Sequence, residues 1–168
     1  KSELKKVVTA EVGNIFKFCT EKSENMGIYF TDADGKQQPI YLASYGVGIT
    51  RVMGVIAEKE SDGKGLVWPI NIAPYHVYLA TIGDVNEQAE QLYKDLQTAG
   101  VEVLYDDRDE RPGNKFADAD LMGIPYRIVL SPKTIEQDSV ELKSRTDSDT
   151  DLVKLDSIIE IIKEKIIT

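Results

Sequence analysis

The chain has 168 residues, enough for one large or two small domains, and its hydrophobic fraction of 42% is compatible with a packed core. Its 20 basic and 29 acidic side chains give a net charge of −9, which argues against a protein held to nucleic acid by general electrostatic attraction, although not against a local basic site. One cysteine, Cys19, and one histidine, His76, exclude an internal disulfide and a Cys/His zinc cluster, and no apolar run is long enough to cross a bilayer.

The first part of the chain predicts a few antiparallel strands followed by one helix. Strands are expected at residues 11–19, 28–31 and 36–45, with a short helix in the polar stretch 20–27 and a turn at 32–35. An apolar face at helical spacing then predicts a helix that ends near Glu60, and a loop is expected at 61–65. These strands require further neighbours in a sheet, which this stretch does not supply. The stretch is therefore expected to be a piece of a larger sheet.

From residue 75 onward, strands alternate with helices, which predicts a largely parallel or mixed sheet with helices on its faces. Strands are expected at 76–82, 101–105, 126–130 and 140–145, and helices at 85–99, 116–122 and 155–166. Asp84 is expected to cap the first of these helices. The proline-containing segment 71–74 is interpreted as a joint between domains.

Two glycines and an arginine form a distinctive junction between the last strand of the first part and its helix. Gly46 and Gly48 allow a tight turn and close approach to a ligand, and a helix start favours anions. The dinucleotide-binding pattern requires glycine where Arg51 stands, so that interpretation fails. An arginine here can stack on a purine or meet a phosphate, but the spacing alone favours a plain turn with a surface arginine.

Four ordered segments resemble the C-terminal part of bacterial-type prolyl-tRNA synthetases, which are class II aminoacyl-tRNA synthetases. These segments are residues 11–16 (EVGNIF), 44–58 (beginning SYGVGITR), 65–69 (GLVWP) and 106–113 (DDRDERPG). The resemblance covers nearly the whole chain. It implies that residues 1–70 are the C-terminal part of an antiparallel catalytic sheet, and that residues 71–168 are a three-layer α/β anticodon-binding domain with a mixed sheet.

Members of that family use ATP, as its Mg²⁺ complex, to activate proline and attach it to tRNA(Pro). The resemblance implies a proline pocket formed by Glu11, Asn14, Thr20, Ser44 and Gly46. It also implies that Gly46, Gly48 and Arg51 bind ATP, with Arg51 as the catalytic residue that stacks on adenine and neutralises phosphate charge. Asn14 stands where bacterial-type enzymes often carry histidine, yet asparagine still donates and accepts hydrogen bonds. Metal ligands and a second arginine motif are expected upstream, so the chain alone is expected to be inactive.

A charged segment at 106–115 follows a predicted strand, at the sheet edge where ligands of open α/β sheets bind. By itself such a mixture of charges favours a solvated loop. The resemblance implies that this loop and the next helix read the anticodon, through Asp107, Arg108, Glu110, Lys115, Phe116 and Asp120. Carboxylates accept from base amino groups, and cations pair with guanine oxygens.

Two alternatives stay open at this point. A non-catalytic relative that serves as a tRNA-binding accessory or sensor module is one, although the retained glycine pair and Arg51 argue against it. A threonyl- or histidyl-tRNA synthetase is the other, although the segments at 11–16 and 65–69 favour the prolyl form. The family implies a cytoplasmic, homodimeric full-length protein without a membrane anchor.

Overall fold

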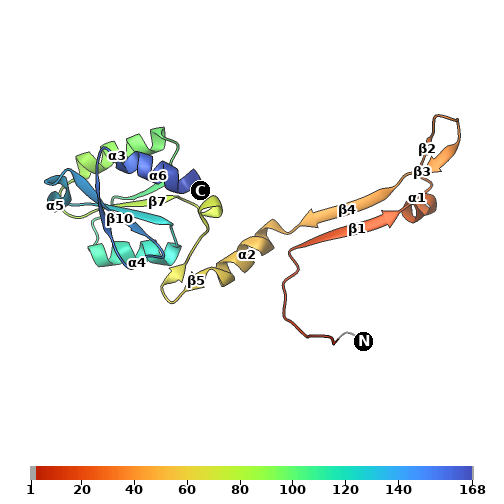
Figure 1. Cartoon of the computed structure of the whole chain (residues 1–168), viewed down its shortest axis with the longest axis horizontal. Helices are drawn as coiled ribbons and strands as arrows, with labels where there is room; N and C mark the ends of the chain where they lie inside the picture. Colours follow the sequence, from red (N-terminus) through yellow and green to blue (C-terminus); the bar gives the residue numbers. More distant parts are fainter. Residues whose placement is uncertain (1–2, 168) are drawn as a thin grey trace. The chain divides into compact units, whose positions relative to one another are not determined.

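The computed structural model describes residues 3–167, which form two compact units divided between Ile56 and Ala57. The first unit is built on an antiparallel pair of strands, β1 (Gly13–Cys19) and β4 (Leu42–Val47). The chain between them forms α1 (Glu21–Met26) and a small hairpin of β2 (Tyr29–Thr31) and β3 (Gln37–Pro39), as Figure 1 shows.

The strand expected at 36–45 is two strands, so this prediction was wrong in one respect. The chain changes partner near Ile40: β3 pairs with β2, whereas β4 pairs with β1. The backbone N–H of Ile40 donates to Ile28, and its carbonyl accepts from the buried hydroxyl of Ser23, which holds the chain at this change of direction. Helix α2 (Ile49–Lys59) follows β4 with one residue, Gly48, between them.

The second unit contains a five-stranded mixed sheet with the strand order β11-β10-β9-β7-β8, which confirms the expected sheet type. Its parallel strands are β7 (Val77–Thr81), β8 (Val103–Asp106) and β9 (Tyr126–Leu130). Its antiparallel strands are β10 (Ser139–Ser144) and β11 (Asp151–Lys154).

Helices cover both faces of this sheet, which gives the expected three layers (Figure 1). Helices α3 (Asn86–Thr98) and α6 (Ile158–Ile167) pack on one face, where Leu79, Leu96 and Ile162 belong to the larger hydrophobic core. Helix α4 (Pro112–Met122) packs on the other face around the smaller core of Tyr78, Ala80, Ala119 and Ile124. Alternating residues of β7 therefore face opposite cores.

Several local boundaries differ from the sequence predictions. Asp84 does not cap α3, because Val85 occupies the N-cap position and no side chain caps the helix. Helix α4 begins four residues earlier than expected, at Pro112, because proline fits the first helical position. The last helix begins at Ile158 rather than 155, because the unpredicted strand β11 precedes it. The short helices α5 (Pro132–Ile135) and η1 (Ile70–Ile72) were not predicted either.

The loop expected at 61–65 is a hairpin of β5 (Ser61–Asp62) and β6 (Gly65–Leu66). Asp62 stabilises its turn, because Oδ1 accepts the backbone N–H groups of Lys64 and Gly65 at 2.8 and 3.0 Å. The hairpin packs against α4 in the second unit. The domain boundary at residue 70 stays a prediction.

Candidate functional sites

Six of the residues predicted to bind proline or ATP line one surface cavity of about 370 Å³ in the first unit. These residues are Glu11, Asn14, Ser44, Gly46, Gly48 and Arg51. The register of β1 and β4 explains the grouping, because it places Asn14 opposite Gly46 and Phe16 opposite Ser44. The start of α2 then brings Arg51 to the same cavity.

Arg51 lies against Glu11 but stays accessible. Its Nη1 donates to the Glu11 backbone carbonyl at 2.6 Å and lies 3.8 Å from Glu11 Oε1. The same carboxylate oxygen accepts from Asn14 Nδ2 at 3.1 Å. The Arg51 and Glu11 side chains are 60% and 66% exposed, so their ion pair is weak and a ligand can compete for either group.

Neither glycine of the junction is required by packing within the described residues. A Cβ added at Gly46 would meet nothing within 4 Å, and one added at Gly48 would lie 3.4 Å from Arg51 Cβ, an ordinary contact. Gly13 is tighter, because its Cβ would lie 3.0 Å from the Gly46 carbonyl oxygen. The missing side chains at Gly46 and Gly48 therefore leave room in the cavity wall.

Thr20 is the predicted pocket residue that does not line this cavity. It occupies the N-cap position of α1, where its side chain makes no capping hydrogen bond. Its role in a proline pocket stays a prediction.

In the second unit, a buried carboxylate organises the predicted RNA-binding loop. Asp106, at the end of β8, accepts Arg108 Nε on Oδ1 and Arg108 Nη2 on Oδ2, both at 2.8 Å, and it accepts the hydroxyl of Tyr78 on Oδ2. The Arg108 hydrogen bonds, followed by that of Tyr78, hold the pKa of Asp106 well below its usual range. Burial and the neighbouring carboxylate raise the pKa of Tyr78.

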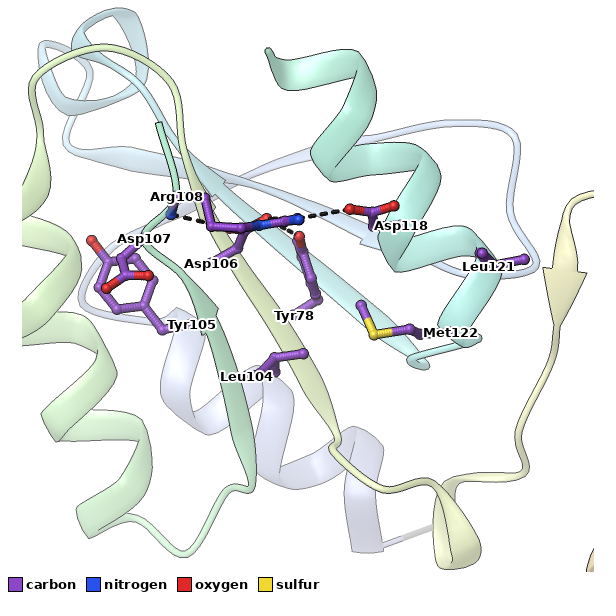
Figure 2. Close-up of a pocket in the computed structure, with 9 residues that line it drawn as sticks. All are labelled: Tyr78, Leu104, Tyr105, Asp106, Asp107, Arg108, Asp118, Leu121 and Met122. Atoms are coloured by element: carbon purple, nitrogen blue, oxygen red, sulfur yellow. Dashed lines mark hydrogen bonds and ion pairs between the residues drawn. The ribbon is translucent and has the colours of Figure 1, made fainter. Parts of the chain in front are cut away.

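This network borders a cavity of about 410 Å³ between β8 and α4, which Figure 2 shows. Arg108 lies across it, and Asp118 of α4 accepts from Arg108 Nη2 at 2.7 Å on the far side. The other residues that line the cavity are Tyr78, Leu104, Tyr105, Asp106, Asp107, Leu121 and Met122. The cavity therefore combines apolar walls with a charged rim.

A second cavity, of about 350 Å³, lies where β7 and β8 end. The chain leaves β7 for α3 on one face of the sheet and leaves β8 for α4 on the other, so this is a topological switch point, where open α/β sheets bind ligands. Four of the six residues predicted to contact RNA line it, namely Asp107, Arg108, Glu110 and Lys115.

Lys115 forms the buried floor of this second cavity and is only 2% exposed. Its Nζ donates to the backbone carbonyls of Asp106 at 3.0 Å and Thr81 at 3.4 Å. The ammonium group thus bridges the ends of β8 and β7, and a contact between Lys115 and RNA stays a prediction.

Phe116 and Asp120 do not line either cavity and instead pack with Arg127 of β9. The Arg127 guanidinium lies 4.1 Å from the centre of the Phe116 ring, and its Nη1 lies 3.5 Å from Asp120 Oδ1. Within residues 3–167, Arg127 Nε is buried without a hydrogen-bond partner, and burial lowers the pKa of this side chain.

Sequence reasoning missed Asp106, Tyr78 and Asp118 as parts of the site. Asp106 was visible as the first acidic residue after a predicted strand, but nothing local marks it as the buried member of the charged segment. Tyr78 and Asp118 reach the network only through the packing of β7 and α4 against β8.

The described residues contain neither a cluster of metal-ligating side chains nor a membrane-spanning helix. Among residues 3–167, no three His, Cys, Asp or Glu side chains come together where they could hold a metal ion. No helix in that range is both long and apolar enough to cross a membrane.

Comparisons with known proteins identify the family to which the chain is similar. The family model described as "Anticodon binding domain" matches residues 76–165. The chain is 46% identical over 154 residues to the proline–tRNA ligase of Dehalococcoides mccartyi, which covers 89% of this chain and 27% of that protein. It is 45% identical over 157 residues to the protein of that name from Geobacter metallireducens, a match that covers 91% of this chain and 28% of that protein. It is 42% identical over 161 residues to the one from Burkholderia cenocepacia, which covers 93% of this chain and 28% of that protein. The chain thus spans about a quarter of the length of these relatives.

Proposed function

Because the chain belongs to the anticodon binding domain family, we propose that its second unit reads the anticodon of tRNA(Pro) as part of a proline–tRNA ligase. The observation that carries this proposal is that relatives named proline–tRNA ligase match both units of the chain, and not only the anticodon-binding part.

The loop between β8 and α4 has the chemistry needed for unpaired bases. Asp107 and Glu110 are exposed carboxylates that can accept from base amino groups, and Arg108 is a cation that can donate to a base carbonyl. A few placed side chains of this kind suit a protein with a net charge of −9, because base contacts rather than general attraction then provide the specificity.

The cavity of the first unit is proposed to bind the aminoacyl-adenylate when the rest of the catalytic domain is present. Glu11 and Asn14 would hold the proline imino group, and Gly46 and Gly48 would allow close approach of the ligand. Arg51 would move from Glu11 to ATP, whose phosphates it can neutralise without acting as a nucleophile. ATP would enter as its Mg²⁺ complex. A homodimeric assembly and a cytoplasmic location belong to the same proposal, and the chain alone should be inactive.

Two assays on the full-length protein that carries this chain test the proposal. Proline-dependent exchange of pyrophosphate into ATP measures activation without tRNA, and prolylation of tRNA(Pro) measures the whole reaction. We expect Arg51→Ala to lose exchange. We expect Arg108→Ala to keep exchange but to lower kcat/KM for tRNA(Pro) by about ten- to a hundred-fold, the cost of losing a specific base contact.

The matched control is Lys94→Ala, which removes an exposed cation from α3 in the same unit. It should leave both assays unchanged. Exchange that depends on another amino acid would overturn the proline assignment. Prolylation that ignores both Arg108 and the anticodon guanines would overturn the role given to the second unit.

A further inference from the structure

Arg108 keeps part of its hydrogen-bonding capacity for a ligand. A guanidinium group carries five N–H donors in one plane. Nε and Nη2 donate to the two oxygens of Asp106, and Nη2 also donates to Asp118 Oδ2, which uses three of the five. The Tyr78 hydroxyl also interacts with this guanidinium. Within residues 3–167, the hydrogen bonds of Arg108 to carboxylates all come from Nε and Nη2 and none from Nη1, and half of the side chain, 51%, is exposed.

The two carboxylates that hold Arg108 differ in burial and come from different elements. Asp106 is 3% exposed and is fixed from below by the hydroxyl of Tyr78. Asp118 is 42% exposed and approaches from α4, across the cavity shown in Figure 2. Asp106 therefore anchors the guanidinium to the sheet, and Asp118 fixes its orientation relative to α4.

We propose that Asp106 and Asp118 are positioning residues for RNA recognition: they hold the Arg108 guanidinium in one plane, so that Nη1 alone is offered to a carbonyl oxygen of an unpaired base. This inference rests on the proposed function of the second unit. The adjoining cavity supplies apolar walls from Leu104 and Met122, against which the ring of such a base packs.

Fixing the guanidinium in advance should increase discrimination as well as affinity. A free arginine loses much side-chain freedom when it binds, and a mobile one adapts to several bases. An arginine whose Nε and Nη2 are already occupied rejects bases that require those donors. Removal of Asp118 should therefore weaken binding of the correct anticodon more than that of an incorrect one.

The test uses the full-length protein and two tRNA(Pro) transcripts, one normal and one with a single anticodon guanine replaced by adenine. The ratio of their kcat/KM values in prolylation measures discrimination. We expect Asp118→Ala to lower this ratio by about ten-fold, because the cognate value falls while the other stays nearly constant. The control, Asp95→Ala, removes an exposed aspartate of α3 and should leave the ratio unchanged.

A double-mutant cycle separates positioning from general damage to the fold. If Asp118 acts through Arg108, then Arg108→Ala with Asp118→Ala should discriminate no worse than Arg108→Ala alone. Independent effects that add, or an unchanged ratio in Asp118→Ala, would overturn the inference. Equal losses on both transcripts together with a lower Tm would do the same, because they indicate a structural role.

These outcomes also distinguish the inference from the proposed function. If Arg108→Ala lowers discrimination and Asp118→Ala does not, only the positioning role fails. If Arg108→Ala itself changes neither transcript, then the loop does not read the anticodon and both proposals fail. The variant Asp106→Asn adds a second check, because it keeps the size of the side chain and one acceptor while removing the paired contact with Nη2.

Discussion

Arg145 and Asp62 form a paired ion bridge although 83 residues separate them. Arg145 Nη1 donates to Asp62 Oδ2 at 2.8 Å, and Nη2 donates to Oδ1 at 2.7 Å. Arg145 Nε donates to the backbone carbonyl of Asp120 in α4 at 3.0 Å, and the arginine side chain is only 4% exposed. One arginine thus ties the β5–β6 hairpin to the sheet and to α4.

Replacing this arginine should release the hairpin. In Arg145→Leu we expect the backbone amides of Val67 and Trp68 to exchange with solvent roughly ten- to a hundred-fold faster, because a buried charged hydrogen-bond donor typically contributes about 1.5–3 kcal/mol. Hydrogen exchange measured by mass spectrometry checks this. The control is Lys143→Leu in the same region of the sheet, whose ammonium donates to Ser148 at the surface. Equal effects of the two variants would show that the ion pair does not hold the hairpin.

A second prediction concerns the glycine that ends α4. Gly123 has φ of +72°, and a Cβ there would lie 2.4 Å from the Leu66 carbonyl oxygen, whereas Gly100 has φ of +82° with nothing within 4 Å. Alanine costs about 1 kcal/mol at either position for its left-handed backbone. Gly123→Ala should cost roughly 2 kcal/mol more than Gly100→Ala, because of the clash.

Urea unfolding followed by the fluorescence of Trp68 measures this difference. Trp68 is the chain's one tryptophan, and its backbone N–H donates to the Gly123 carbonyl at 3.3 Å, so the probe lies at the site of the change. Similar midpoints for the two variants would contradict the close packing of Leu66 on Gly123.

The sequence predicted the layers of the second unit well, because its signals are local. Leu92 and Leu96 of α3 recur at helical spacing, and both are buried against the sheet. Strand β11 was missed for the opposite reason, since residues 151–154 are mostly exposed and show little apolar alternation. The pairing of Arg145 with Asp62 was also beyond local patterns, because it depends on how distant elements pack.

The candidate sites were predicted in part, for related physical reasons. Six cavity residues in the first unit were identified through the resemblance, and the register of β1 and β4 brings them together. The resemblance implied that Lys115 contacts the anticodon, whereas its side chain is buried against the strand ends. Its burial has a signal in hindsight, since Lys115, Ala119 and Met122 recur at helical spacing on the face of α4 that packs on the sheet.

A third prediction tests Lys115 as a structural bridge. Lys115→Met should destabilise the second unit by about 1–3 kcal/mol, because it leaves the strand-end carbonyls of Thr81 and Asp106 without their donor. The control is Lys94→Met, whose ammonium is exposed and lies 3.9 Å from Glu90; it should change stability by less than about 0.5 kcal/mol. Urea unfolding measures both. A Lys115→Met variant as stable as the parent would show that the buried ammonium contributes no net stability.

The last prediction follows from the low pKa of Asp106. Because the Arg108 hydrogen bonds hold that pKa well below its usual range, the folded chain keeps the carboxylate ionised at a pH where the unfolded chain binds a proton. The stability is therefore fully present above the ordinary aspartate pKa of about 3.9 and is lost as the pH falls below it. Asp62, whose pKa is lowered mainly by its hydrogen bond with Arg145, contributes with the same sign.

The variant Asp106→Asn tests this effect through the unfolding free energy measured between pH 5 and pH 3. In this variant the free energy should fall less steeply with decreasing pH, and the number of protons taken up on unfolding should be smaller by up to about one. The exposed control Asp95→Asn should keep the slope of the parent protein. An unchanged slope in Asp106→Asn would mean that this buried carboxylate does not drive the acid sensitivity of the fold.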